Sequence, residues 1–106
     1  MRTNCKEVKL AIREHILEYY DPAELACEVK SLMRNAPRLY PTVYHAVHHM
    51  AESGCFLCYN SDIAAFLDSL DINPAGKVYE PDESFSLYCH LLARDAELIV
   101  RKEDQS

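Results

Sequence analysis

The 106-residue chain contains no tryptophan, only two glycines and only five prolines. This small supply of turn-forming residues argues against a β-sandwich or barrel, because those folds need many tight turns. No uninterrupted apolar run approaches the roughly 20 residues that a membrane-spanning helix requires. The composition therefore favours an α-helical protein and gives no reason to expect a membrane partner.

Signals for export and for a disulfide framework are also missing. Residues 1–6 have neither the apolar segment nor the small-residue cleavage site of a secretory signal, and they lead directly into a charged amphipathic pattern. The five cysteines are an odd number and are scattered among helical patterns. Without an export signal, reduced thiols are the expected state. We therefore expect a cytoplasmic protein.

The composition is that of a folded domain, since hydrophobic residues make up 49% and charged residues 26% of the chain. A chain of this length has room for one core rather than two. We therefore expect a single domain over residues 1–106, in which the polar residues 102–106 form a frayed tail.

Capping signals place the helix boundaries. Asn4, with Glu7 three positions on, predicts the start of a first helix. Asp21 before Pro22 predicts the start of a second helix, which should end before Pro37. Further helices are predicted from residue 41 or 42 to 54, from 60 or 61 to 70, and over about 82–101.

The last predicted helix has an unusually wide apolar arc, which indicates a central helix packed on more than one side. The short apolar run at 55–59 is compatible with a strand or a helix, and a strand there could pair with 77–80. The predicted fold class is all-α or nearly so. We expect one compact bundle of about five helices, with a minor two-stranded element near 55–59 and 77–80 as an open alternative.

The net charge of −6 is unevenly distributed along the chain. Residues 1–40 hold seven basic and six acidic side chains, whereas residues 41–106 hold four basic and eleven acidic ones. Between 41 and 83, Lys77 is the only basic side chain. A surface built from this segment would repel phosphates and attract a basic protein face, so we expect a protein partner and no direct contact with nucleic acid.

Acidic side chains and tyrosines in this segment are the candidate contact residues. Tyrosine is enriched at protein interfaces because its ring buries area while its hydroxyl keeps a polar partner. The predicted partner-binding residues are Glu52, Tyr59, Asp62, Asp68, Asp71, Tyr79, Glu80, Asp82 and Glu83.

A cluster of histidines and cysteines offers an alternative. His45, His49, Cys55 and Cys58 are the residue types of a four-ligand zinc site, and the two histidines share a helix face. The cluster is a weak match, because an extended 55–58 segment would direct the two thiols to opposite faces. We therefore predict no metal site, no cofactor and no catalytic residue, and keep a zinc-binding regulator as the alternative. A small enzyme with a Cys–His pair is a further alternative, although neighbours such as Cys89 and His90 project apart on a helix.

In its size, acidity and lack of a catalytic motif, the chain resembles the small inhibitors that phages and mobile elements make against host defence, anti-CRISPR proteins among them. The resemblance concerns the general character of the whole chain and implies no particular site residue. It implies a non-enzymatic protein-binding module that docks on a basic, nucleic-acid-binding surface of a host protein. A second copy of the chain is another candidate partner, because so small a protein can leave apolar helix faces uncovered.

Overall fold

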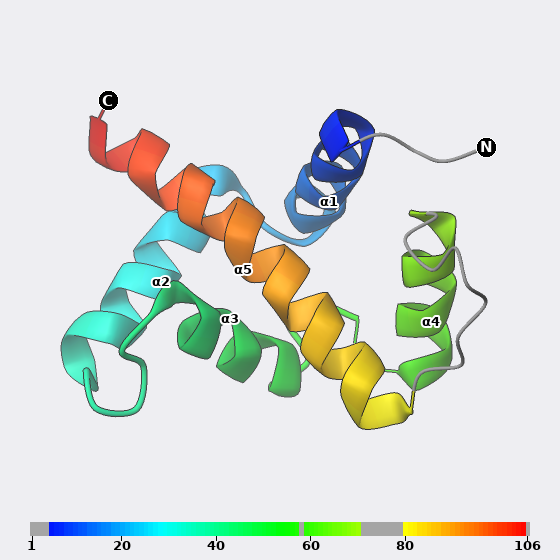
Figure 1. Ribbon diagram of the computed structural model, residues 1–106. Helices are drawn as coiled ribbons and strands as arrows, with labels where there is room; N and C mark the ends of the chain where they lie inside the picture. The colour runs from blue at the N-terminus through cyan, green and yellow to red at the C-terminus, as the bar shows by residue number, and fades with distance from the viewer. Residues whose placement is uncertain (1–4, 58, 71–79, 106) are drawn as a thin grey trace.

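The computed structural model describes residues 5–57, 59–70 and 80–105, and within these ranges it contains five α-helices and no strand (Figure 1). The all-α prediction is confirmed. The helices, in chain order, are α1 (Cys5–Tyr19), α2 (Pro22–Asn35), α3 (Val43–Glu52), α4 (Asn60–Ser69) and α5 (Pro81–Gln105).

The segment after α3 turns instead of extending, so the two-stranded alternative is wrong for the residues described there. Residues 55–57 and 59 and Glu80 belong to no strand. Gly54 has a left-handed φ of 83°, its N–H donates to the carbonyl of Ala51 at 3.1 Å, and the N–H of Cys55 donates to the carbonyl of Met50 at 3.0 Å. These two bonds close the end of α3 in a Schellman motif and fix the turn. Cys58 and residues 77–79 lie outside the described ranges.

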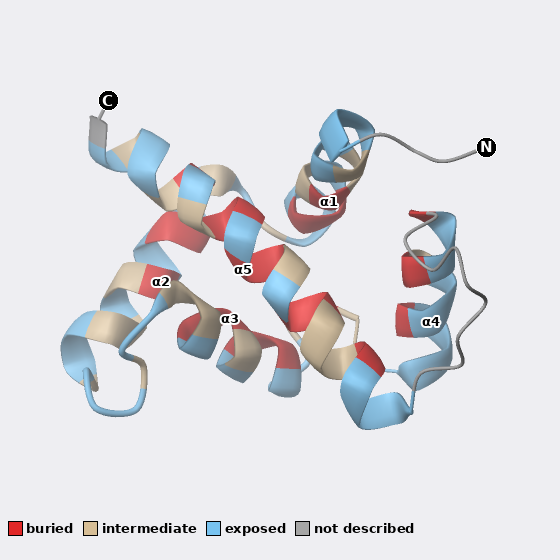
Figure 2. Ribbon diagram, viewed as in Figure 1, coloured by how far each residue is buried: buried red, intermediate tan, exposed pale blue. Residues whose placement is uncertain are grey.

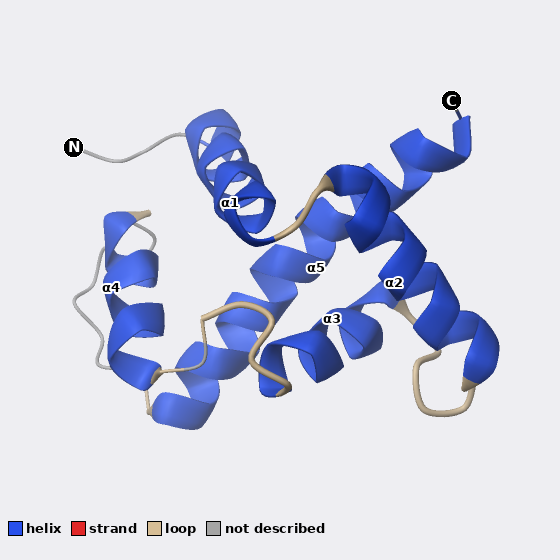
Figure 3. Cartoon of the chain, turned by 180° about the vertical axis from the view of Figure 1, so that it is seen from behind, coloured by secondary structure: helices blue, strands red, loops and turns tan. Residues whose placement is uncertain are grey.

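Side-chain caps explain two of the helix starts, of which the Asp21 cap was predicted. The Asp21 carboxylate accepts a hydrogen bond from the N–H of Ala23 at 2.9 Å, and Pro22 opens α2 as predicted. The Thr42 hydroxyl accepts from the N–H of His45 at 3.4 Å and caps α3. The helix starts are visible among the loops in Figure 3. Asn4, the predicted cap of α1, lies outside the described residues.

The start of α4 differs from the prediction. Tyr59 is its N-cap residue, in place of Asn60 or Ser61, and no side chain there makes a capping hydrogen bond. The Tyr59 carbonyl accepts from the N–H groups of Asp62 and Ile63 at 3.0 Å each, which is sufficient to begin the helix. The side chain of Tyr59 is consequently left at the surface.

Helix α5 is the centre of the molecule, as its wide apolar arc predicts, because it packs against each of the other four helices. Figure 2 shows buried positions recurring along its length, and the buried positions of α4 on the side of that helix facing α5. Tyr88, Cys89 and Leu92 are completely buried at its middle.

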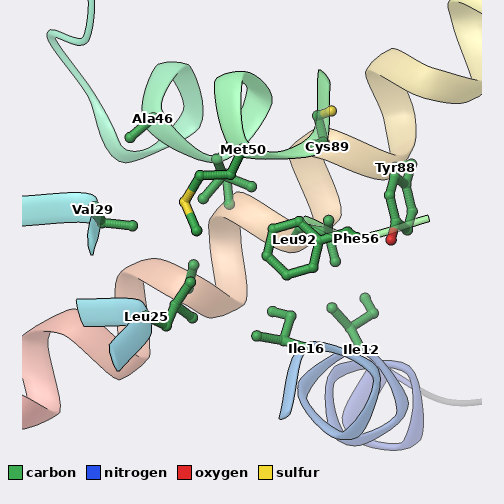
Figure 4. Packing of buried hydrophobic residues seen from close by; sticks show 14 of the residues in the cluster. Ile12, Ile16, Leu25, Val29, Ala46, Met50, Phe56, Tyr88, Cys89 and Leu92 are labelled. Carbon is green, nitrogen blue, oxygen red and sulfur yellow. The ribbon is translucent and has the colours of Figure 1, made fainter. Parts of the chain in front are cut away.

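The core is one cluster to which all five helices contribute, together with Phe56 from the turn after α3. Figure 4 shows Leu25, Met50 and Ile16 converging on the region around Leu92. Tyr19, which the pattern of the first helix places on the buried face, is instead 42% exposed. It is the last residue of α1, where the chain turns toward α2.

Residues 102–105, expected to fray, continue α5. The Asp104 carboxylate accepts a hydrogen bond from the Lys30 ammonium on α2, and Arg101 pairs with Glu97 one turn earlier at 2.7 Å. The Lys30–Asp104 pair joins the last turn of α5 to α2, whereas the Arg101–Glu97 pair lies within α5. Among the described helices, none combines the length and the apolar character needed to cross a bilayer.

Candidate protein-binding surface

Exposed carboxylates gather on α4 and at the start of α5. We call Asp62, Asp68, Glu80 and Asp82 the acidic end; all four are exposed, and none forms a salt bridge with the lysines and arginines that the structure describes. Neither α4 nor α5 before Arg94 contains a lysine or arginine. Helix α4 packs directly against α5 (Figure 1), so these carboxylates lie on neighbouring elements, with Asp62 in the first turn of α4 and Asp68 in its last turn.

Helix dipoles affect these carboxylates in opposite ways. Asp62 and Asp82 lie in the first turns of α4 and α5, where a negative charge is favourable. Asp68 lies in the last turn of α4, where the partial charge of the helix end is already negative. The carboxylate of Asp68 therefore destabilises its own helix, and its position is not explained by folding.

An aromatic side chain accompanies the acidic end. Tyr59 is 70% exposed, the largest exposed fraction among the large hydrophobic side chains of the described residues. It precedes α4 by one residue and is three positions from Asp62. An exposed aromatic ring on a rigid helix start has the character of an interface anchor.

The remaining predicted contact residues are Glu52, Glu83, Asp71 and Tyr79. Glu52 ends α3, and its carboxylate lies 2.6 Å from the His48 ring nitrogen Nδ1. It lines a different hollow of about 280 Å³, together with Tyr40, Tyr44 and His45. Glu83 is exposed in the first turn of α5, beside Asp82. Asp71 and Tyr79 lie outside the described residues.

The histidines of α3 contact aromatic and hydroxyl groups. His45 Nδ1 lies 2.7 Å from the Thr42 hydroxyl, and the His49 ring is 5.1 Å from that of Tyr40. His90 on α5 stacks on Tyr44 at 4.3 Å. In the ranges that the structure describes, no group of three or more histidine, cysteine or acidic side chains is placed to hold a metal ion. Cys58, one of the four zinc candidates, is not among those residues.

Cys89 and His90 have different environments. Cys89 is fully buried, and this burial, with a smaller contribution from the Glu52 charge, raises the pKa of its thiol to about 12. The reactive thiolate is therefore strongly disfavoured at neutral pH. His90 is exposed at the surface of α5.

A buried polar network supports the turn that leads to Tyr59. His15 Nε2 lies 2.7 Å from the Tyr88 hydroxyl, which also accepts from the N–H of Leu57 at 3.1 Å. The Tyr88 hydroxyl therefore joins the His15 ring to the Leu57 amide, and the His15 ring stacks on Phe66 of α4 at 4.0 Å. Burial lowers the pKa of His15, and the Glu18 charge opposes this effect. The network connects α1, α5 and the 55–57 turn.

The sequence predictions did not single out Asp95, which is only 6% exposed. One oxygen of its carboxyl group, Oδ2, is buried without a hydrogen-bond partner. A signal was present, because Tyr88, Leu92, Asp95 and Ile99 are spaced as one helical stripe and the other three are buried. A carboxylate on the buried face of a helix indicates either a charge that is paired within the fold or a functional site.

No protein-family model, no curated protein and no solved structure matches this chain. A functional proposal therefore has to be argued from the exposed carboxylates and the aromatic residue beside them.

Proposed function

We propose that this chain is a small protein-binding module whose acidic end docks on a basic surface of another protein, without a catalytic step of its own. The supporting observation is that Asp62 and Asp68 on α4 and Glu80 and Asp82 at the start of α5 are exposed, and none pairs with a described lysine or arginine. Carboxylates that are not paired within the chain are available to a basic partner.

Long-range attraction is the physical advantage of this arrangement. A negative surface raises the rate of encounter with a positive one and disfavours partners of like charge. Basic protein faces commonly serve to hold phosphate backbones, so a rigid set of carboxylates can compete for the same face. The finer form of our proposal is a phage or mobile-element inhibitor, similar in character to anti-CRISPR proteins, that blocks a nucleic-acid-binding surface of a host complex.

Tyr59 supplies the part of the interaction that charge alone does not. Charged groups at the rim of an interface mainly affect the rate of association, whereas buried aromatic residues contribute much of the affinity. Because Tyr59 is 70% exposed beside the acidic end, its ring can be buried by a partner that the carboxylates attract. Truncation of Tyr59 should therefore mainly speed dissociation.

Two charge-matched variants test the proposal. Asp68→Lys with Glu80→Lys alters the acidic end, and Glu14→Lys with Glu28→Lys alters exposed positions on α1 and α2. Each pair reverses two charges and changes the net charge from −6 to −2. We expect the first pair to lose capture of the partner from host extract, and the second pair to retain it. Circular dichroism should show the same helix content for both.

The salt dependence and a competitor complete the test. Capture by the wild type should weaken as salt increases, and heparin, a polyanion, should displace the chain from its partner. Equal capture by the Asp68/Glu80 pair and the wild type would contradict the proposal. Equal losses by both pairs would also contradict it, because net charge rather than this surface would then govern binding.

A further inference from the structure

The loop that connects α2 and α3 (Figure 3) borders a hollow on one face of α3. Leu39 and Tyr40 line it from the loop. The other lining residues recur at helical spacing along α3, and they are Tyr44, His45, His48, His49 and Glu52. The volume of about 280 Å³ is below the roughly 300–1,000 Å³ of sites for drug-sized ligands, so the hollow has room for one long side chain.

Aromatic rings form most of this lining, and contacts hold them in place. The Tyr40 ring is 5.1 Å from that of His49. The Tyr44 ring is 5.8 Å from that of His48, and His90 of α5 stacks on it at 4.3 Å. Both tyrosines are half-buried and pack against the core cluster. A ligand would therefore meet rings that are already positioned, which lowers the entropic cost of binding.

Charge decides which kind of ligand suits these rings. Glu52 is the only acidic residue among the described residues that line the hollow, and none of them is a lysine or an arginine. Its Oε1 atom lies 2.6 Å from His48 Nδ1, and the second oxygen of the carboxylate can accept further hydrogen bonds. The faces of aromatic rings carry partial negative charge and attract cations, as the carboxylate does. The lining therefore favours a cation over an anion.

We propose that this hollow receives an arginine side chain from the basic face of a partner, an inference that rests on the proposed function for the source of that arginine. The guanidinium group donates to Glu52 and stacks against the tyrosine rings, because its planar shape suits both contacts. The aliphatic stem packs on Leu39, which is 67% exposed. A lysine fits less well, since its ammonium group is more strongly hydrated and has no flat face.

The Tyr44–His90 stack connects this hollow to the acidic end. His90 also lines an open hollow with Asp82 at the start of α5. A basic surface that approaches Asp82 is therefore separated from Tyr44 by one stacked ring. The arginine contact adds a specific recognition element to the long-range attraction of the carboxylates.

N-acetyl-arginine amide is the probe, and N-acetyl-citrulline amide, which has the same shape without the charge, is its matched control. The full chain is titrated at constant ionic strength and at pH 8, above the usual titration range of imidazole, and followed by amide NMR. The arginine probe should shift signals from residues 39–52, leave those of α1 unchanged, and bind with a Kd on the order of 1 mM. Citrulline should bind about fivefold more weakly, the upper value of an exposed ion pair, and the lysine analogue should also be weaker than arginine.

Two charge-matched variants identify the carboxylate. Glu52→Gln and Glu28→Gln each replace an exposed acid and change the net charge from −6 to −5. Glu52→Gln should bind the arginine and citrulline probes equally, because the charge that distinguishes them is gone. Glu28→Gln, on α2, should keep the fivefold preference for arginine. The Asp68→Lys, Glu80→Lys pair should also keep it, since neither residue lines the hollow.

The inference is overturned if the arginine probe shifts no signals at about 20 mM, where a ligand of the expected Kd would occupy nearly every site. An unchanged preference in Glu52→Gln, or equal binding of the lysine analogue, would also overturn it. If the probe fails while partner capture still depends on Asp68 and Glu80, only this inference is wrong. If the probe binds as expected while capture does not depend on those two residues, the proposed function is wrong and the arginine site stands.

Discussion

Replacement of Tyr88 by phenylalanine tests the buried polar network directly. Tyr88 is fully buried, and its hydroxyl group serves both His15 Nε2 and the N–H of Leu57. The substitution keeps the ring and its packing but leaves both groups without this partner. An unsatisfied buried polar group costs about 1–3 kcal/mol, and the Leu57 amide, being only partly buried, lies at the low end of that range. We therefore expect the free energy of unfolding to fall by about 2–3 kcal/mol.

Urea unfolding followed by circular dichroism measures this loss. The midpoint should fall while the slope with denaturant stays constant, because the area exposed on unfolding hardly changes. For a chain of this size the melting temperature should fall by on the order of 10–20 °C. Tyr59→Phe is the matched control, since Tyr59 is 70% exposed, and it should cost less than about 0.5 kcal/mol. A Tyr88→Phe variant as stable as this control would refute the network.

Substitutions at four further positions follow from the same structure. Burial lowers the pKa of His15 in the folded chain, so stability should fall as the pH drops from the unfolded-state value of 6.5 through the folded-state pKa. His15→Gln should remove this pH dependence from the urea midpoints. A pH dependence that persists in the variant would assign it to another group. Burial raises the pKa of Asp95, so the wild type should lose stability as the pH rises above 3.8 through the folded-state pKa. The free energy of unfolding of Asp95→Leu should exceed that of the wild type by about 1–3 kcal/mol at neutral pH and by less in acid. An equal difference at both pH values would contradict this. Gly54→Ala should lower the free energy of unfolding by about 1 kcal/mol in thermal unfolding, because Gly54 has a left-handed φ. A steric clash is not the cause, since an added Cβ meets no atom within 4 Å, and Gly54→Asn should cost less because Asn tolerates this φ. Equal losses would argue against backbone strain. Asp68→Lys should raise the free energy of unfolding by about 0.3–1 kcal/mol in low salt, and a decrease would mean that Asp68 has a structural role.

Local signals made much of the fold predictable. Asp21 caps α2 through a hydrogen bond that spans two residues, and the wide apolar arc of α5 reflects contacts along its own surface. The 55–57 turn could not be predicted in the same way. Its path depends on Phe56 entering the core and on the N–H of Leu57 donating to Tyr88, which is 31 positions away in the chain.

The candidate surface was predictable to a similar extent. The absence of lysine and arginine from α4 and from α5 before Arg94 is a property of the sequence, and the exposure of Asp62 and Asp68 followed from the amphipathic pattern. Glu52 differs from these carboxylates because it ends α3 and lies within ion-pair distance of His48, one turn earlier. Asp95 was missed because its burial depends on how closely α1 covers α5, which no local pattern specifies.

Stability and the proposed binding role separate most clearly at Asp68. The core cluster and the His15–Tyr88 network hold α1, α4 and α5 together, and Asp62 and Asp82 are favourably placed at helix starts. If Asp68 served folding, the helix dipole would favour a basic residue in the last turn of α4, yet the chain has a carboxylate there. A residue that weakens its own helix while remaining exposed is more readily explained by an external contact. Asp68→Lys should therefore raise stability and lower partner capture. This pair of opposite effects distinguishes a binding surface from a merely solvated one.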